Sequence, residues 1–392
     1  MNITFLAENL TRTGGSSFSL DLMARSLSER GHSITVLTAN IFKENGDLNK
    51  KSYDIHNNVA SSKNRYEGIK NVKRVLNKYE ENTDIYHIFN PKYLPISGLY
   101  RRKGSVPTVG RINAYDAFCT NPSLMNGKCF KDCTLMNKLR HDDRDRTNKI
   151  SKVPQYVYQH TSTRFINYLD RIFALSPSIK EVYSHNNVNE KLIDVVPNFY
   201  DPEFTMEYEP DIDILLDDLT VTYIGRIRME KGVDLLIDAV QEMDLSNTAV
   251  NIIGEGPIRN EIETEARDAN ISDSVRFHGW VDQSALSNFY TQSDVFVHPG
   301  RWPEPFGRTV LEALQCGCLP VVSDIGAPPW IVGSAGMTFR PNDPSDLANK
   351  LTELQRDPNI LEQAEKYKSR AEKFEPNRII SKLEAKYREI YD

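Results

Sequence analysis

The chain has few cysteines, ordinary amounts of glycine and proline, and no long apolar run, and each of these features excludes a class of protein. Five cysteines scattered over 392 residues do not form the dense framework of a small disulfide-rich domain. Twenty glycines and twenty prolines exclude collagen-like and low-complexity chains. No stretch reaches the roughly 18 apolar residues of a membrane span, and residues 1–17 lack the charged and apolar regions of a signal peptide. We therefore expect a soluble, cytoplasmic protein with two or three domains.

Charge is unevenly distributed along the chain. The net charge is −6, but residues 1–200 contain 29 Lys and Arg against 19 Asp and Glu, while residues 201–392 contain 19 against 35. Two basic segments, residues 63–78 and 128–152, either face an anionic membrane, such as the inner face of a cell membrane, or form solvated surfaces. The acidic total and the absence of a recognisable motif argue against nucleic acid.

Short β-branched runs alternate with segments of helical periodicity. In the first half we expect strands at residues 2–7, 33–38, 85–88, 106–109 and 171–175. The pattern restarts with expected strands at residues 219–224, 249–253, 275–278, 295–298 and 319–323. Strands that alternate with helices form parallel sheets covered on both faces. We expect two doubly wound α/β domains joined by a linker at residues 195–204, with ligands bound beyond the carboxyl ends of the strands.

The most informative stretch is HPGRWPEPFGRTVLEALQCGCLPVVSD, residues 298–324. A helix is predicted to begin near Phe306 and Gly307, after a loop rich in proline and glycine. Its first amides lack intrahelical acceptors and carry the positive end of the helix dipole, which suits a diphosphate; they belong to Arg308, Thr309 and Val310. Glu304 precedes this helix end and Glu312 lies about one and a half turns inside it, where carboxylates suit hydroxyl groups such as those of a ribose. The alternative is an ordinary surface helix with a solvated glutamate.

A second stretch, VTYIGRIRMEKG, covers residues 221–232. A predicted strand ends at Gly225, and Arg226 and Lys231 follow in the turn before a helix. Both cations can approach one phosphate group, and a fixed pair of cations stabilises the charge on a departing diphosphate without a metal. Two solvated side chains are the alternative.

Taken together, these residues resemble the retaining, family-four glycosyltransferases of GT-B fold. Glu304-Pro-Phe-Gly followed by Glu312 matches the family's E-x7-E signature. The resemblance covers the whole chain, strongly in residues 219–340 and loosely in 40–200. Further matching segments are Gly14-Gly15, Gly225-Arg226, Lys231-Gly232, Gly254-Glu255-Gly256-Pro257 and Phe277-His278-Gly279.

The resemblance implies a GT-B fold, with two doubly wound Rossmann-like domains that face each other across a cleft. Residues 1–198 would bind the acceptor, and residues 199–374 would bind the nucleotide sugar. A last helix, at about residues 375–392, would cross back onto the first domain.

The resemblance also implies the chemistry: transfer of a sugar, with retention of configuration, from a nucleotide sugar to a glycan or lipid-linked glycan. A UDP-sugar is the expected donor, and neither cofactor nor metal is implied. Arg226, Lys231 and Glu304 would be catalytic, with Glu304 on the donor sugar. Glu312 would bind the ribose, and Gly15 would let the backbone approach the donor phosphate. The other donor contacts implied are Gly225, Gly254, Glu255, Phe306, Gly307, Arg308, Thr309 and Val310.

The sequence departs from the family pattern in two places. In RINAYDAFC, residues 111–119, Asn113 stands where one branch of the family has a histidine; Asn113, Tyr115 and Asp116 are the acceptor-side candidates. An amide cannot move a proton, so that role is vacant or falls to Asp116 or to the substrate. Trp330 replaces the acid of many relatives, where it would either stack on a sugar or belong to the core.

The cysteines allow more than one interpretation. Cys119, Cys129 and Cys133 could bind zinc with a fourth ligand such as His141, although the spacing is unlike C-x2-C. A disulfide between Cys129 and either Cys119 or Cys133 is equally compatible with the spacing, and so are three free thiols. The pair Cys316 and Cys318 flanks Gly317, and we expect it to be buried and structural.

Three other classes compete with a glycosyltransferase. A nucleotide-sugar epimerase of similar architecture is expected to lack the Arg226/Lys231 pair together with E-x7-E. A dinucleotide-dependent oxidoreductase is disfavoured because Gly14-Gly15 is not part of a G-x-G-x-x-G motif. A relative that binds a nucleotide sugar without turnover is favoured only by Asn113.

Overall fold

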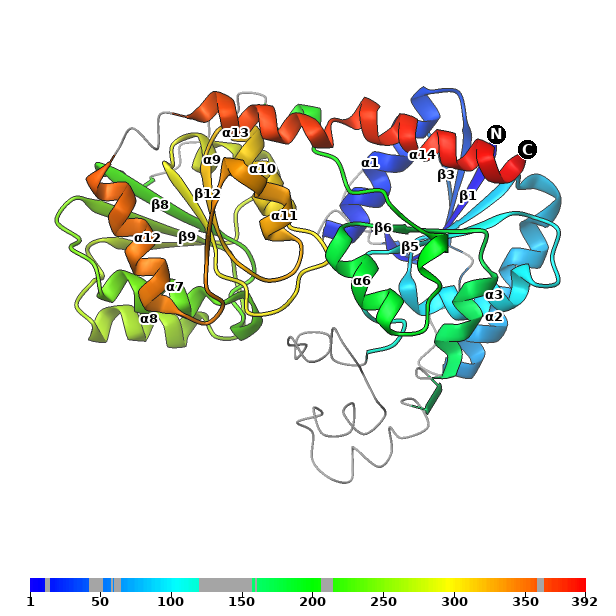
Figure 1. The fold of residues 1–392 in the computed structure, drawn as a ribbon, viewed down its shortest axis with the longest axis horizontal. Helices are drawn as coiled ribbons and strands as arrows, with labels where there is room; N and C mark the ends of the chain where they lie inside the picture. The colour runs from blue at the N-terminus through cyan, green and yellow to red at the C-terminus, as the bar shows by residue number, and fades with distance from the viewer. Residues whose placement is uncertain are drawn as a thin grey trace. The chain divides into compact units, whose positions relative to one another are not determined.

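The chain is divided between two α/β units in the computed structural model (Figure 1). Unit 1 consists of Met1–Phe199 and Pro376–Asp392, and unit 2 consists of Tyr200–Glu375. The structure describes residues 1–10, 15–41, 52–57, 59, 65–119, 157–158, 161–205, 214–357 and 363–392. Within those ranges, every helix falls short of the length and apolar character that crossing a membrane requires.

Unit 1 is built on a parallel sheet of seven described strands in the order β3-β2-β1-β4-β5-β6-β7. The strands are β1 (Asn2–Leu10), β2 (Ser33–Ile41), β3 (Asp54–His56), β4 (Ile85–Ile88), β5 (Thr108–Ile112), β6 (Arg171–Ala174) and β7 (Ile193–Val195). The helices of this unit whose bounds fall within the described residues are α1 (Gly15–Glu29), α2 (Arg65–Tyr79), α3 (Leu94–Arg101), α6 (Pro177–His185) and α14 (Pro376–Tyr391). Since the chain moves outward from β1 to β3 and then returns to the other side of β1, the sheet is doubly wound.

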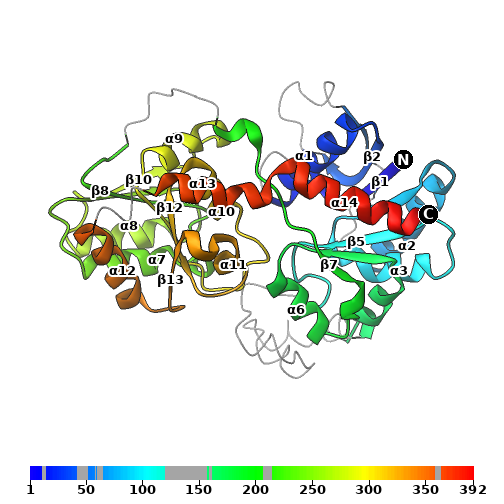
Figure 2. The same ribbon diagram turned by 45° about the horizontal axis from the view of Figure 1, so that its top comes forward.

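Unit 2 repeats this plan with six described strands in the order β10-β9-β8-β11-β12-β13. The strands are β8 (Leu219–Ile224), β9 (Thr248–Ile253), β10 (Val275–Gly279), β11 (Val295–His298), β12 (Leu319–Ser323) and β13 (Met337–Phe339). The helices are α7 (Val233–Gln241), α8 (Arg259–Asp268), α9 (Leu286–Thr291), α10 (Arg308–Cys316), α11 (Pro328–Val332), α12 (Pro344–Arg356) and α13 (Ala364–Ala371). Figure 2 shows α7 and α8 beside this sheet.

The predicted doubly wound α/β architecture is confirmed, and four strands have the predicted bounds: β4, β8, β11 and β12. Every residue of these four strands is buried, as in a parallel sheet covered on both faces. The strand expected at residues 106–109 was placed too early, because it begins at Thr108. Pro107 has no amide to donate, and only its carbonyl pairs, with the amide of Tyr86 at 2.9 Å.

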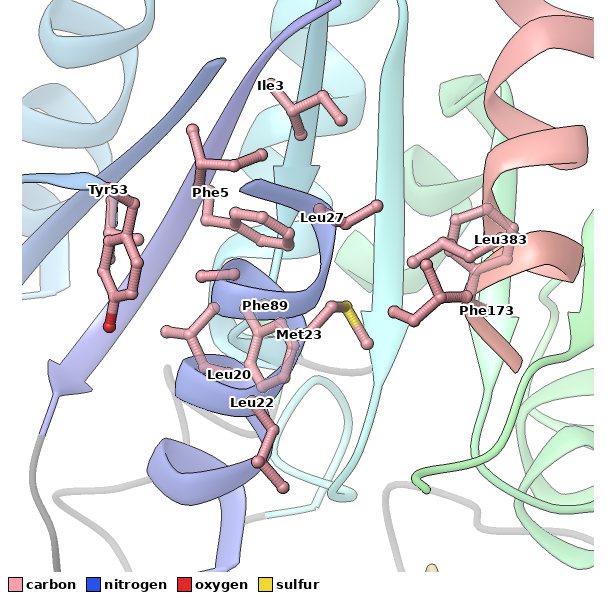
Figure 3. Packing of buried hydrophobic residues seen from close by; sticks show 14 of the residues in the cluster. Ile3, Phe5, Leu20, Leu22, Met23, Leu27, Tyr53, Phe89, Phe173 and Leu383 are labelled. Carbon is pink, nitrogen blue, oxygen red and sulfur yellow. The ribbon is translucent and has the colours of Figure 1, made fainter. Parts of the chain in front are cut away.

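Helix α1 supplies much of the core of unit 1 (Figure 3). The predicted apolar positions Leu20, Met23, Ala24 and Leu27 are fully buried. They pack in one cluster with Phe5 of β1 and with residues of the C-terminal helix α14, namely Ile379, Ile380, Leu383 and Tyr387. The last helix of the chain therefore belongs to the core of unit 1, although in the sequence it follows unit 2.

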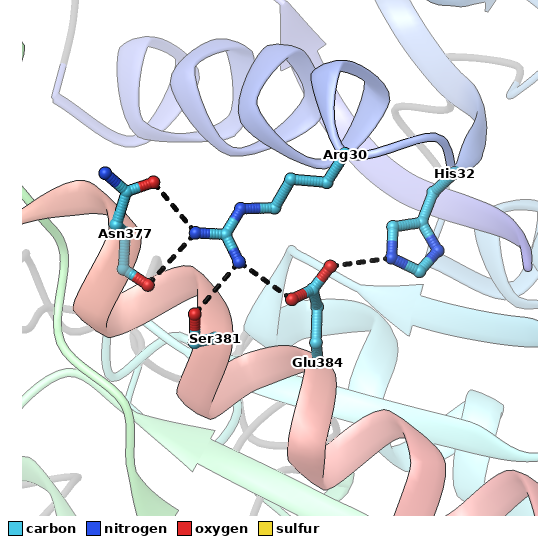
Figure 4. A network of polar contacts seen from close by, with 5 residues as sticks. All are labelled: Arg30, His32, Asn377, Ser381 and Glu384. Carbon is cyan, nitrogen blue, oxygen red and sulfur yellow. Dashed lines mark hydrogen bonds and ion pairs between the residues drawn. The ribbon is translucent and has the colours of Figure 1, made fainter.

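A polar network fastens α14 to the end of α1 (Figure 4). Arg30 donates to Glu384 and Ser381, both at 2.9 Å, and to the side chain of Asn377 at 2.8 Å. The second carboxylate oxygen of Glu384 lies 2.9 Å from Nε2 of His32. Burial raises the pKa of Glu384, but the hydrogen bonds from His32 and Arg30 outweigh it, so the pKa is lowered.

Replacing Glu384 with glutamine is expected to reduce the free energy of unfolding by about 1–3 kcal/mol near neutral pH, because both partners lose a charged acceptor. A carboxyl whose pKa is lowered by folding stabilises the protein above its ordinary pKa, and this stabilisation is lost as the pH falls through the folded value. The difference between variant and wild type should therefore shrink in acid, as measured by urea unfolding across pH. Glu389→Gln, in an exposed pair with Lys386 on the same helix, should have little effect at any pH; equal losses for both variants would contradict the assignment.

Candidate active site

The strand order of unit 2 has a switch point between β8 and β11. From β8 the chain continues to β9 on one side, and from β11 it continues to β12 on the other. At such a point the two connections leave adjacent carboxyl ends in opposite directions, and doubly wound sheets bind their ligands there. Lys231 lies in the connection after β8, and Glu304 lies in the connection after β11.

Glu304 is bound by two side chains at this switch point. Its Oε1 lies 2.5 Å from Nζ of Lys231 and 3.3 Å from Nε2 of His298, the last residue of β11. Glu304 and His298 are buried, with 8% and 7% of each residue exposed, whereas Lys231 is half-buried. A buried carboxylate is costly unless it is paired, so the three side chains act as one unit.

The electrostatic balance keeps Glu304 ionised. Burial by itself raises the pKa of Glu304, but Lys231 and His298 together lower it far below the usual carboxyl range. Both contacts fall on Oε1, and no hydrogen bond or ion pair within the described part of the chain involves Oε2. An ionised carboxylate only accepts hydrogen bonds, so Oε2 is available to a hydroxyl donor.

Backbone and side-chain contacts hold the loop that carries Glu304. The guanidinium of Arg301 pairs with Asp234 in the first turn of α7. On the other side, the amide of Ala327 donates to the carbonyl of Glu304 at 2.9 Å. A Cβ on Gly326 would lie 2.6 Å from the amide nitrogen of Glu304, so glycine permits this close approach.

Helix α10 begins directly after this loop. Its N-cap residue Gly307 provides no side-chain cap, and the amide of Leu311 donates to the Gly307 carbonyl at 3.1 Å. Phe306 is buried, with its ring 6.0 Å from that of Phe374, and so anchors the start of the helix. Helix geometry leaves the first amides without intrahelical acceptors at the positive end of the dipole; these are the predicted Arg308, Thr309 and Val310.

Glu312 is buried inside unit 2, with 5% of the residue exposed, so a solvated surface glutamate is the wrong interpretation. Its Oε2 accepts a hydrogen bond of 3.2 Å from the hydroxyl of Tyr290 on α9. Burial raises the pKa of Glu312, with Arg308 opposing that shift, and burial lowers the pKa of Arg308. Glu312 is therefore a weakly compensated acid inside α10, just over one turn from the start of the helix.

The loops after β8 and β9 pack backbone against backbone. A Cβ on Gly254, which has a φ of +135°, would lie 1.8 Å from the carbonyl oxygen of Gly225. The glycines thus let the two loops meet. Arg226 is exposed and takes part in no ion pair within the described residues, whereas the exposed Glu255 pairs with Arg259 on α8. The structure brings Lys231 to Glu304 and leaves Arg226 at the surface.

In unit 1, Asn113 follows β5 and joins two other elements. Its Nδ2 donates to Oγ of Ser16 in the first turn of α1 at 2.9 Å and to the carbonyl of Phe89 after β4 at 3.0 Å. Gly15 is the first residue of α1, and a Cβ added there would meet no atom of the described chain within 4 Å. The amide of Asn113 therefore has a structural task, which the sequence did not indicate.

The other two acceptor-side candidates differ in burial. Tyr115 is fully buried, and its ring lies edge-on to that of Phe118 at 6.0 Å. Asp116 is half-buried, and its pKa is raised, mainly by burial and also by Glu8, with Lys92 opposing. Of the two, Asp116 has the accessible polar side chain.

The predictions for the cysteines have different outcomes. The expected burial of Cys316 and Cys318 is confirmed, and burial raises the pKa of the Cys316 thiol to about 12. Cys119 forms no disulfide within the described residues. The remaining predicted residues of this group, together with Gly14 and the basic segment 128–152, lie outside the described residues; they are Cys129, Cys133 and His141.

Trp330 lies in α11 and forms an aromatic group with its neighbours. Its ring is edge-on to that of Phe374 at a centroid distance of 5.4 Å. The carbonyl of Trp330 accepts a hydrogen bond of 2.5 Å from Arg370. The residue is partly exposed, so it is neither a fully buried core residue nor a side chain without packing contacts.

Two residues of the site were missed by the sequence interpretation. His298 was assigned only as a strand end, and Tyr290 was not singled out. His298 could have been found from its position, because a polar residue at the carboxyl end of a buried strand points to a ligand site. Tyr290 has no such signal, since only packing of α9 against α10 brings it to Glu312.

Comparison with protein families covers both units. Residues 13–204 match the model described as Glycosyltransferase Family 4, and residues 206–374 match Glycosyl transferases group 1. The chain belongs to the family-four glycosyltransferases. The fold of these glycosyltransferases, GT-B, agrees with the two doubly wound units.

Individual relatives of this glycosyltransferase align over part of their length. An uncharacterized glycosyltransferase from Methanocaldococcus jannaschii is 28% identical over 191 residues, which are 45% of this chain and 49% of the relative. The gpi3 subunit of phosphatidylinositol N-acetylglucosaminyltransferase from Schizosaccharomyces pombe is 27% identical over 170 residues, which are 43% of this chain and 36% of the relative. The match therefore spans less than half of these two relatives.

Solved structures of similar fold align over nearly the whole chain. HepE from Anabaena in complex with UDP has a TM-score of 0.73 at 17% identity, covering 98% of this chain and 99% of that one. Sucrose-phosphate synthase from Thermosynechococcus elongatus has a TM-score of 0.75 at 17% identity, covering 100% and 99%. At 17% identity, the similarity to these structures establishes only the fold of this chain.

Proposed function

We propose that the protein is a retaining glycosyltransferase that moves a sugar from a nucleotide sugar to a glycan or lipid-linked glycan. The observation that carries this proposal is the pair Lys231–Glu304 at the switch point of unit 2, where Glu304 lies four residues before the start of α10. A cation and a helix N-terminus suit a diphosphate, and an ionised carboxylate suits sugar hydroxyls. Membership in the family-four glycosyltransferases supports the same assignment.

The donor is proposed to be a UDP-sugar bound by unit 2. The diphosphate would contact the first amides of α10, with Lys231 and Arg226 as its cations. The hydroxyls of the ribose would take the place of the present partners of Glu312 as hydrogen-bond donors. Glu304 would accept hydrogen bonds from the hydroxyls of the donor sugar. Solved structures of HepE contain UDP and UDP-glucose, which supports this choice of nucleotide.

The proposed transfer breaks the bond between the anomeric carbon and the diphosphate oxygen and forms a bond from that carbon to an acceptor oxygen. The acceptor attacks on the face from which the diphosphate leaves, and the acceptor proton passes to a departing phosphate oxygen. Lys231, Arg226 and the helix end would stabilise the developing negative charge, so no metal is required in this proposal. The acceptor would bind to unit 1, where Asp116 is the candidate for holding its hydroxyl.

A second candidate function is nucleotide-sugar binding without turnover. It is favoured by Asn113, whose side-chain amide is committed to Ser16 and Phe89 and cannot accept a proton. A thermal-shift and hydrolysis screen with UDP-, GDP- and ADP-sugars separates the two functions. A shift with slow nucleotide release supports the transferase, a shift without turnover in the presence of acceptors supports the binding protein, and no shift with any nucleotide sugar contradicts both.

Replacing Glu312 with alanine is expected to weaken donor binding by about tenfold or more, because a buried hydrogen-bonding partner of the ribose is lost. Isothermal titration with UDP measures this directly. Glu353→Ala, at an exposed glutamate on α12, is the matched control and should bind as the wild type does. An unchanged affinity in the Glu312 variant would refute the ribose assignment.

Peripheral membrane contact is proposed for helix α2, whose exposed residues include Lys73, Arg74 and Lys78. Reversing the charge of Lys73 and Arg74 is expected to weaken co-sedimentation with vesicles that contain anionic phospholipid, since each basic residue near such a surface contributes about 1 kcal/mol. The same reversal at Arg356 and Lys366 in unit 2 is the control. Binding that is equal in all three proteins would favour an ordinary solvated surface.

A further inference from the structure

Among the described residues, the side chain of His298 has one polar contact, and that contact is with Glu304. Its Nε2 lies 3.3 Å from Oε1 of Glu304, whereas its Nδ1 is buried without a hydrogen-bond partner in the described part of the chain. A Cβ on Gly300 would lie 3.1 Å from Cε1 of this ring, so the glycine makes room for it. Burying an imidazole with one nitrogen unpaired is unfavourable. The contact between Nε2 and Glu304 offsets this cost.

The two partners of Glu304 are placed differently. Lys231 and His298 share Oε1, but Lys231 retains 27% of its side-chain surface exposed and His298 retains 8%. A flexible ammonium at a half-open position can turn toward another anion, whereas a buried ring at the end of a strand keeps its place.

A donor diphosphate would compete with Glu304 for Lys231. The diphosphate carries more negative charge than one carboxylate and would lie at the helix end that follows Glu304 in the chain. If Lys231 turned away and nothing remained on Oε1, a buried carboxylate would be left unpaired beside an anion, which is strongly unfavourable.

We propose that His298 is a positioning residue that keeps Glu304 paired and oriented while Lys231 turns to the donor diphosphate. This inference rests on the proposed function. Because an ionised carboxylate only accepts, Nε2 of His298 donates in this bond. With Oε1 held by His298, Oε2 keeps its direction for the donor sugar.

A four-protein cycle with UDP as the probe tests the inference. His298→Phe should weaken UDP binding by about tenfold, because the carboxylate of Glu304 is then left unpaired when Lys231 turns to the diphosphate. The double variant His298→Phe/Glu304→Gln should bind UDP as well as Glu304→Gln alone does, since a glutamine carries no charge that could be left unpaired. His298→Gln, which keeps a donor near the position of Nε2, should bind UDP nearly as well as the wild type does. Thermal unfolding of each protein and His298→Ala, a smaller replacement, control for misfolding.

The outcomes separate this inference from the proposed function. If the wild type binds UDP and His298→Phe binds it equally well, or if the double variant is as weak as His298→Phe, the positioning role is overturned while nucleotide binding stands. If the wild type binds none of the four probes UDP, GDP, ADP and inorganic pyrophosphate, the proposed function is overturned, and so is the inference that rests on it.

Discussion

Replacing Lys231 with alanine is expected to lower the turnover of a nucleotide sugar by about 100-fold to 1000-fold. The reason is that the departing diphosphate loses a fixed cation in a site where burial strengthens electrostatic interactions. Lys231 is held at Glu304 from the loop after β8, which keeps the ammonium next to the proposed diphosphate site until the donor arrives. Steady-state release of nucleotide in the presence and absence of acceptor measures the effect.

Two further variants make this result specific. Lys231→Arg keeps the charge and should retain more turnover than Lys231→Ala, and Lys350→Ala on α12 should leave turnover unchanged. Thermal unfolding must accompany these assays, because removal of Lys231 leaves Glu304 with His298 as its remaining partner. Near-normal turnover in a folded Lys231→Ala protein would exclude the proposed catalytic role.

Replacing Gly254 with alanine is expected to destabilise unit 2 by about 3 kcal/mol or more, the largest stability effect that we predict. The added Cβ would lie 1.8 Å from the carbonyl oxygen of Gly225, which is backbone and cannot rotate away. The φ of +135° at this position is also unfavourable for any residue with a Cβ. Chemical unfolding followed by circular dichroism measures the loss.

Gly15→Ala is the matched glycine control. A Cβ at Gly15 meets no described residue within 4 Å, and the residue lies at the start of α1, where alanine is a good helix former. Its free energy of unfolding should stay the same or rise slightly. Equal destabilisation by both substitutions would show that loss of glycine, rather than the contact with Gly225, causes the effect.

Much of the fold could be predicted from local patterns. The strand at residues 219–224, LTVTYI, is rich in β-branched residues and is buried over its whole length, so its composition and its environment agree. The three-residue strands β3, β7 and β13 were not predicted, because three residues cannot establish a period. Strand β1 continues to Leu10 beyond the predicted end, since Asn9 and Leu10 pair with Asn40 and Ile41 of β2.

The candidate site was predicted in part. The sequence marked Lys231, Glu304, Glu312 and the start of α10, because glycine-rich loops after strands and acids beside a helix start are local features. It paired Lys231 with Arg226 as two cations for one phosphate group. It did not predict the ion pair between Lys231 and Glu304. It also treated Glu312 as open to solvent in the alternative interpretation, although Tyr290 and the surrounding helices bury it.

The sequence by itself determined the period of the strands, the glycines that permit close approach, and the chemical types of the site residues, since each of these is a property of a few neighbouring positions. Only the tertiary structure decided which side chains meet. Lys231 and Glu304 are 73 positions apart and Tyr290 and Glu312 are 22 apart. Their contacts follow from strand order and from helix packing, which places β11 beside β8 and α9 against α10. That order is set by the energy of burying whole sheets and helices, which no local pattern contains.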